Sequence, residues 1–162
     1  MKHRIRSAVT LLASVALVGL GVGPAFAAPD TDLEAEVAAI LAAYPGGTEL
    51  QPGVISWDDG ATVLTLEGAA VSQRDVASCR TGQYCAWSNT SYIGTKLTFT
   101  GCSVGGYPSS LALLGGLARS TANARSSGHV DAVAGVSTIY SMPANSGNPA
   151  NGVTLTALVC YT

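Results

Sequence analysis

The four cysteines of this chain constrain its fold more than any other feature, because all of them lie in its second half, at Cys79, Cys85, Cys102 and Cys160. Their spacings of 6, 17 and 58 residues contain no C-x2-C pair of the kind that holds zinc. In an exported chain, an even number of cysteines predicts disulfides. Of the three possible pairings we expect Cys79 with Cys85 and Cys102 with Cys160.

The first residues have the pattern of a secretory signal peptide. Lys2, Arg4 and Arg6 precede an apolar run over residues 8–22, and Ala25-Phe26-Ala27 is a typical cleavage sequence. The apolar run is shorter than the roughly 20 residues of a membrane span. We therefore expect residues 1–27 to be removed and the mature protein to be secreted and extracellular, without a membrane-spanning segment.

Charge divides the remaining chain near residue 78. Residues 28–78 contain nine acidic side chains against one basic one, whereas residues 79–162 contain one acidic side chain against four basic ones. Two readings stay open: the halves neutralise each other within one domain, or the acidic segment is separable. Removal of residues 28–78 as a pro-segment is a further possibility that the sequence leaves open.

The acidic segment, 28–78, predicts one helix and one β-hairpin. Thr31-Asp32-Leu33-Glu34 is a capping box, and the following apolar residues form one helical stripe to about Ala43. Pro45-Gly46-Gly47 ends the helix. Residues 54–57 and 61–67, joined through 58–60, have the pattern of a hairpin.

From Cys79 onward the pattern alternates with a period of two, which predicts a sandwich of short strands. We expect strands at residues 84–88, 95–100, 137–140 and 153–161. In the last of these, Val153, Leu155, Ala157 and Val159 are predicted to point inward. The apolar run at residues 111–114 fits a strand, a helical turn or a loop.

A folded hairpin is predicted at Trp87, Tyr92 and Gly94, where Gly94 takes a positive φ and Tyr92 covers the corner. Tyr140 and Gly147 repeat this spacing, with Asn145 in place of the corner aromatic. The pattern resembles the βγ-crystallin Greek-key signature. The resemblance implies a mainly β fold, a βγ-crystallin-like Greek-key sandwich over residues 79–162, preceded by the N-terminal helix and hairpin.

The wider arrangement, with an export signal, an N-terminal helix and the stretch from Cys79 to Trp87, resembles a secreted bacterial peptidase inhibitor family. Its founding members inhibit metalloproteinases. The resemblance implies a protein that is not an enzyme and whose partner is a secreted protease, specifically a metalloprotease. The alternative is a non-catalytic structural or cell-envelope binding module on the same fold. The oligomeric state stays open.

Residues 101–117 are the segment that we expect to enter a protease cleft, because Cys102 pins one end and apolar side chains follow it. The candidate contact residues are Cys102, Ser103, Val104, Tyr107, Leu111, Leu113 and Leu114. The competing interpretation buries the leucines in the sandwich.

Other chemistries find little support in the sequence. Residues 101–105 match G-x-S-x-G, but His129 precedes Asp131 and too few residues follow for an α/β-hydrolase. The crystallin-like calcium pattern at residues 120–123 lacks its acidic lead, and Asp131 is the only carboxylate in residues 79–162. Without a basic cluster, nucleic-acid binding is not expected. We therefore expect no cofactor and no metal.

Overall fold

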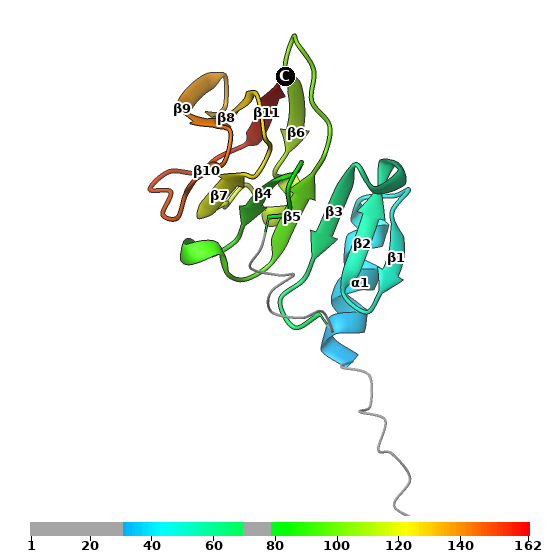
Figure 1. Cartoon of the computed structure of the whole chain (residues 1–162). Helices are drawn as coiled ribbons and strands as arrows, with labels where there is room; N and C mark the ends of the chain where they lie inside the picture. The colour runs from blue at the N-terminus through cyan, green and yellow to red at the C-terminus, as the bar shows by residue number, and fades with distance from the viewer. Residues whose placement is uncertain (1–30, 70–78) are drawn as a thin grey trace, which may run out of the picture.

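The computed structural model describes residues 31–69 and 79–162, and in these ranges it contains one α-helix and eleven strands in two antiparallel sheets (Figure 1). The helix, α1, spans Thr31–Ala43. The first sheet contains, in spatial order, β1 (Thr48–Gln51), β2 (Val54–Trp57), β3 (Thr62–Thr65), β5 (Lys96–Phe99), β4 (Tyr84–Trp87), β7 (Ser120–Asn123) and β10 (Ser146–Asn148). The second contains β6 (Tyr107–Ser110), β11 (Ala157–Tyr161), β8 (His129–Ala134) and β9 (Ser137–Pro143). The described residues also form 3-10 turns at Asp58–Gly60, Thr90–Tyr92 and Ala112–Leu114.

Strands β4 to β11 form two equivalent Greek keys. In the first, β4 lies between β5 and β7, while β6 crosses to the other sheet. In the second, β8 lies between β9 and β11, while β10 crosses back. The two keys therefore exchange their third strands, and the predicted mainly β, crystallin-like sandwich is confirmed.

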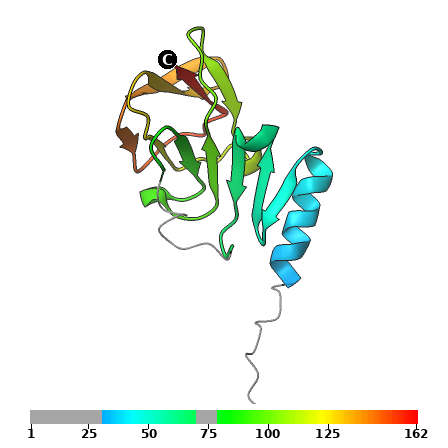
Figure 2. The same ribbon diagram turned by 45° about the vertical axis from the view of Figure 1, so that its right-hand side comes forward.

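The core lies on one face of the first sheet. Ile55, Leu64, Leu97 and Ala86 are laterally paired across four strands, and each is fully buried. The second sheet covers part of this face with Val130, Ala132 and Leu158, and α1 joins the same cluster through Val37. Figure 2 shows α1 along the β1–β3 end of the first sheet, away from β8 and β9. The second layer thus consists of the second sheet and α1.

The acidic and basic segments share the first sheet, because β3 pairs with β5 along its whole length. The predicted hairpin is present as β2 and β3, and α1 ends at Ala43 as expected. Strand β1 was not predicted; it pairs with β2 and its four residues are all exposed. The predicted boundary near residue 78 and the signal peptide at 1–27 lie outside the described residues.

The prediction of which residues point inward in the last strand was wrong, because within β11 the buried positions are shifted by one residue. Leu155 is buried, but it precedes β11, which begins at Ala157. Within β11 the buried residues are Leu158 and Cys160, whereas Val153 is 47% exposed. The reason is a break in the alternation at Thr156, whose backbone bonds both to Val133 and to Leu111 before the strand starts.

The corner predicted after β4 is formed. Gly94 has φ +83°, and a Cβ there would lie 2.7 Å from the Asn89 side chain. The rings of Trp87 and Tyr92 meet edge to face at 5.1 Å. The Ser120 hydroxyl, which the sequence interpretation missed, accepts a hydrogen bond from the Tyr92 backbone N–H and donates one to the Asn89 carbonyl.

The second predicted corner, at Tyr140 and Gly147, is not formed. Tyr140 lies in β9 and Gly147 in β10, and these strands belong to different sheets. Gly147 is also not among the residues with positive φ, whereas Asn145 is, with φ +55°. Gly147 instead leaves room for the first corner, because a Cβ there would lie 2.9 Å from the Tyr92 hydroxyl oxygen.

Candidate inhibitory loop

The connection between β5 and β6 projects from one end of the sandwich, beside the C-terminus (Figures 1 and 2). We call its residues 101–106 the Cys102 loop. Both predicted disulfides are present, and one of them, between Cys102 and Cys160, joins this loop to β11. Because Cys160 lies on the inner face of β11, the loop is attached from the core side of the second sheet.

Backbone hydrogen bonds fix the Cys102 loop further. The Ser103 N–H donates to the Cys160 carbonyl, and the Thr162 N–H donates to the Ser103 carbonyl, at 3.4 and 3.3 Å. The Gly106 N–H also donates to the Ser103 carbonyl, at 3.1 Å, which closes a turn with Val104 and Gly105 at its tip. The loop is therefore tied to β11 and to itself.

Two glycines let aromatic rings pack against the loop. A Cβ at Gly101 would lie 2.7 Å from the Tyr107 ring, and one at Gly106 would lie 2.7 Å from the Tyr161 ring. Gly106 also has φ +86°, a conformation that glycine adopts without strain. Since Tyr161 and Cys160 point to opposite faces of β11, the loop straddles the end of that strand.

The predicted contact residues separate into exposed and buried groups. Val104 is 88% exposed and Tyr107 is 43% exposed, whereas Leu111 is fully buried and Leu114 nearly so. Leu113 is half-buried against the core, as are Cys102 and Ser103 beside the disulfide. Of the predicted contact residues, Val104 and Tyr107 are therefore exposed, whereas Leu111 and Leu114 belong to the core.

Tyr84 supports the base of the loop, and the sequence interpretation did not find it. Its hydroxyl donates to the Gly101 carbonyl at 2.7 Å and lies 2.7 Å from the Ser109 hydroxyl. Burial raises the pKa of this phenol above its usual value. The available signal was a tyrosine in a predicted core strand, because a buried tyrosine hydroxyl needs a hydrogen-bond partner.

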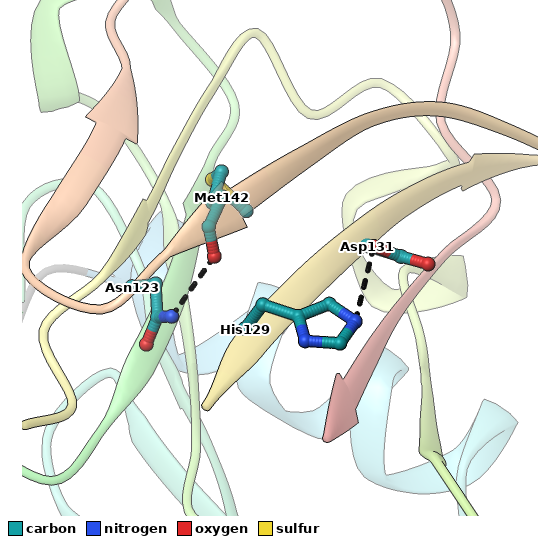
Figure 3. A network of polar contacts seen from close by, with 4 residues as sticks. All are labelled: Asn123, His129, Asp131 and Met142. Atoms are coloured by element: carbon teal, nitrogen blue, oxygen red, sulfur yellow. Dashed lines mark hydrogen bonds and ion pairs between the residues drawn. The ribbon is translucent and has the colours of Figure 1, made fainter. Parts of the chain in front are cut away.

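The outer face of the second sheet supports the loop from the other side. His129 and Asp131 share one face of β8, and their side chains approach to 3.8 Å (Figure 3). The His129 ring stacks on Tyr161, with centroids 4.6 Å apart. Tyr161 is thus held between β8 and the loop.

The Asn123 amide, also in Figure 3, donates to the Met142 carbonyl at 3.1 Å and joins the two sheets.

The described residues offer few other reactive arrangements. Among them, Ser103 bonds through its backbone to Cys160, Gly106 and Thr162, and the His129 side chain contacts Asp131 and Tyr161. No group of three His, Cys, Asp or Glu side chains is placed to hold a metal ion in the described ranges. No helix within residues 31–69 and 79–162 is long and apolar enough to cross a membrane. The arrangement that stands out is a rigid, protruding loop with an exposed valine.

Comparison with family models relates part of the chain to a known family. The model of peptidase inhibitor family I36 matches residues 72–131, which include β4 to β7 and the whole Cys102 loop. Searches of curated proteins and of solved structures found no match for the chain. The matched family consists of inhibitors and not of enzymes, as the resemblance in the sequence implied. Over residues 72–131, this chain is therefore similar to peptidase inhibitor family I36.

Proposed function

We propose that the protein inhibits a secreted metalloprotease, and that it does so by inserting Val104 into a hydrophobic specificity pocket of the enzyme. The observation that carries the proposal is an apolar side chain 88% exposed at the tip of a loop fixed at both ends. An isolated exposed valine needs no explanation, but one presented by a disulfide-anchored turn has the form of a binding element.

Rigidity supports binding because a partner need not order the loop. Fixing the backbone of one flexible residue costs about 1–2 kcal/mol. In the Cys102 loop the disulfide, the Ser103 hydrogen bonds and the Tyr161 ring have already restricted the chain. More of the interaction free energy therefore contributes to affinity.

The hydrogen bonds of the Ser103 carbonyl also favour inhibition over cleavage. This carbonyl belongs to the peptide bond that precedes Val104, and it accepts from both Gly106 and Thr162. A protease that polarised this carbonyl toward a catalytic zinc would have to break both hydrogen bonds. If the bond were cut, Cys160 would still hold the end at Cys102 through the disulfide. Both effects favour a long-lived complex over release of two fragments.

The choice of a metalloprotease rests on the resemblance to an inhibitor family whose founding members act on such enzymes. The choice of a secreted target rests on the signal-peptide pattern of residues 1–27 and on the two disulfides. Specificity for one enzyme class is therefore the part of the proposal that an experiment must decide.

The test is titration of the purified mature protein against a thermolysin-like metalloprotease and against a secreted serine protease. We expect the metalloprotease to lose its activity at a one-to-one ratio and the serine protease to keep it. Inhibition of the serine protease alone would contradict the proposed enzyme class. No effect on several secreted proteases would favour the cell-envelope binding module instead.

Paired valine variants test the role of the loop. Val104→Asp places a charge in the proposed pocket, and we expect inhibition to weaken roughly 30-fold or more, as for an interface hot spot. The matched control is Val136→Asp, since Val136 is also fully exposed but lies in the β8–β9 hairpin. Equal inhibition by both variants would refute the assignment of Val104.

A further inference from the structure

A groove of about 430 Å³ lies next to the Cys102 loop, between the two elements that cover the first sheet. Trp57, Thr62 and Phe99, which are lateral partners in β2, β3 and β5, line it from the sheet. The end of α1 lines one side, and β6 with the following 3-10 turn lines the other. Its volume falls within the roughly 300–1,000 Å³ of ordinary ligand pockets.

The aromatic side chains of the groove are held in place by the protein itself. The Trp57 indole N–H donates to the Tyr44 carbonyl at 3.1 Å, and a Cβ at Gly47 would lie 2.6 Å from the indole ring. The Tyr44 hydroxyl donates across the groove to the Ala112 carbonyl at 3.4 Å. Tyr107 packs against the Gly101 backbone. The groove is therefore preformed.

The charge that lines the groove is negative. Asp58 is the only charged residue among those that line it. Residues 31–69, which supply one side of the groove, contain seven acidic side chains and no Lys, Arg or His. Aromatic faces beside a carboxylate favour an organic cation with an aliphatic stem, because the cation gains attraction from both.

We propose that this groove binds a basic side chain, Arg or Lys, on the surface of the protease that the Cys102 loop engages. This inference rests on the proposed function and adds a second contact to it. Continuity supports the choice of occupant: Tyr107 packs on the loop at Gly101 and also lines the groove, so a protein bound at Val104 extends over the groove entrance. Charge complementarity then selects a basic residue.

The groove can be tested without any protease. The probe is N-acetyl-arginine methylamide, and the neutral control is the citrulline derivative, which has nearly the same shape. The chain has two tryptophans, so NMR should show two indole N–H signals: Trp57 in the groove and Trp87, which is 1% exposed, as an internal control. We expect the arginine probe alone to shift the Trp57 signal saturably.

A pair of adjacent carboxylates supplies matched variants. Asp58 lines the groove and Asp59 does not, although both have left-handed backbone conformations with φ near 50°. Asparagine tolerates this conformation, so Asp58→Asn and Asp59→Asn should both fold. We expect Asp58→Asn to weaken probe binding roughly two- to fivefold, as for an exposed ion pair, and Asp59→Asn to leave it unchanged.

The outcomes separate this proposal from the proposed function. Equal shifts by the arginine and citrulline probes, or equal loss in both variants, would overturn the basic-residue assignment. In titrations with the inhibited metalloprotease, Asp58→Asn should weaken inhibition by a similar two- to fivefold and Asp59→Asn should not. If Val104→Asp inhibits like the parent while the arginine probe still binds, the loop proposal fails but the groove stays. If Asp58→Asn leaves inhibition unchanged, a protease contact at the groove is refuted.

Discussion

Removing one disulfide at a time shows whether the Cys102–Cys160 bridge holds the Cys102 loop in its binding conformation or only stabilises the fold. The double variant Cys102→Ala/Cys160→Ala opens a bridge that spans 58 residues, whereas Cys79→Ala/Cys85→Ala opens one that spans 6. Each pair has one fully buried cysteine and one half-buried cysteine, so the loss of packing is similar in the two variants. A difference in stability or inhibition between the two variants therefore reflects the length of the closed segment and the place of the bridge in the fold.

The expected free energies follow from the length of each closed segment. On the chain-entropy model, the longer bridge stabilises the fold by about 4 kcal/mol and the shorter one by about 2 kcal/mol. The Cys102–Cys160 variant should thus be less stable by a further ~2 kcal/mol. Guanidinium unfolding, followed by tryptophan fluorescence, measures this difference through the transition midpoints.

Inhibition should separate the two variants more sharply than stability does. Without its bridge to β11, the Cys102 loop must be ordered by the protease, and we expect inhibition to weaken about tenfold or more, which corresponds to about 1.4 kcal/mol. The Cys79–Cys85 variant leaves the loop anchored and should inhibit like the parent. If the Cys102–Cys160 variant is folded and inhibits undiminished, or if both variants lose inhibition equally, preorganisation of this loop by its disulfide is refuted.

Four further substitutions, one of them a control, test single contacts. Gly106→Ala should weaken inhibition, because the new Cβ meets the Tyr161 ring and the backbone has a positive φ. Gly105→Ala should leave inhibition unchanged, because its Cβ would meet nothing within 4 Å. Titration against the enzyme measures both. Leu111→Ala should cost about 2–5 kcal/mol in guanidinium unfolding yet leave inhibition by the folded protein unchanged, and a loss of inhibition would restore Leu111 as a contact residue. Tyr84→Phe should cost about 1–3 kcal/mol, because Gly101 and Ser109 lose a buried partner. Because the pKa of Tyr84 is raised in the folded state, the phenol of the unfolded chain ionises first, and the stability of the parent is constant below about pH 10 and falls as the pH rises further. The melting temperature of Tyr84→Phe should therefore fall less than that of the parent over this pH range. An equal fall in both proteins would contradict this.

Local chemistry predicted much of this fold. The α1 boundaries, the β2–β3 hairpin and the corner at Gly94 follow from capping, turn and glycine preferences that act over a few residues. The disulfide pairing was also predicted and is present in the structure. The exchange of third strands between the two Greek keys was not predicted, because spacing alone does not say which sheet receives a strand.

The predictions failed where contacts between distant segments determine the local structure. The face of β11 changed at Thr156, whose two backbone bonds go to distant segments that no local pattern reveals. The spacing from Tyr140 to Gly147 matched the first motif, but these residues lie in strands of different sheets. The leucines of residues 111–114 gave no periodicity, and Leu111 proved to be a core residue. The groove at Trp57 was invisible in the sequence because it joins α1, three strands of one sheet and β6 of the other.

Amide hydrogen exchange on the complex with the inhibited metalloprotease tests the central proposal most directly. Val104 and Gly105 form the exposed tip of the Cys102 loop, and the hairpin around Val136 is an equally exposed reference. We predict that binding slows exchange at residues 103–107 and leaves the Val136 hairpin unchanged. Protection confined to the β8–β9 hairpin, with residues 103–107 exchanging as in the free protein, would contradict inhibition through the Cys102 loop.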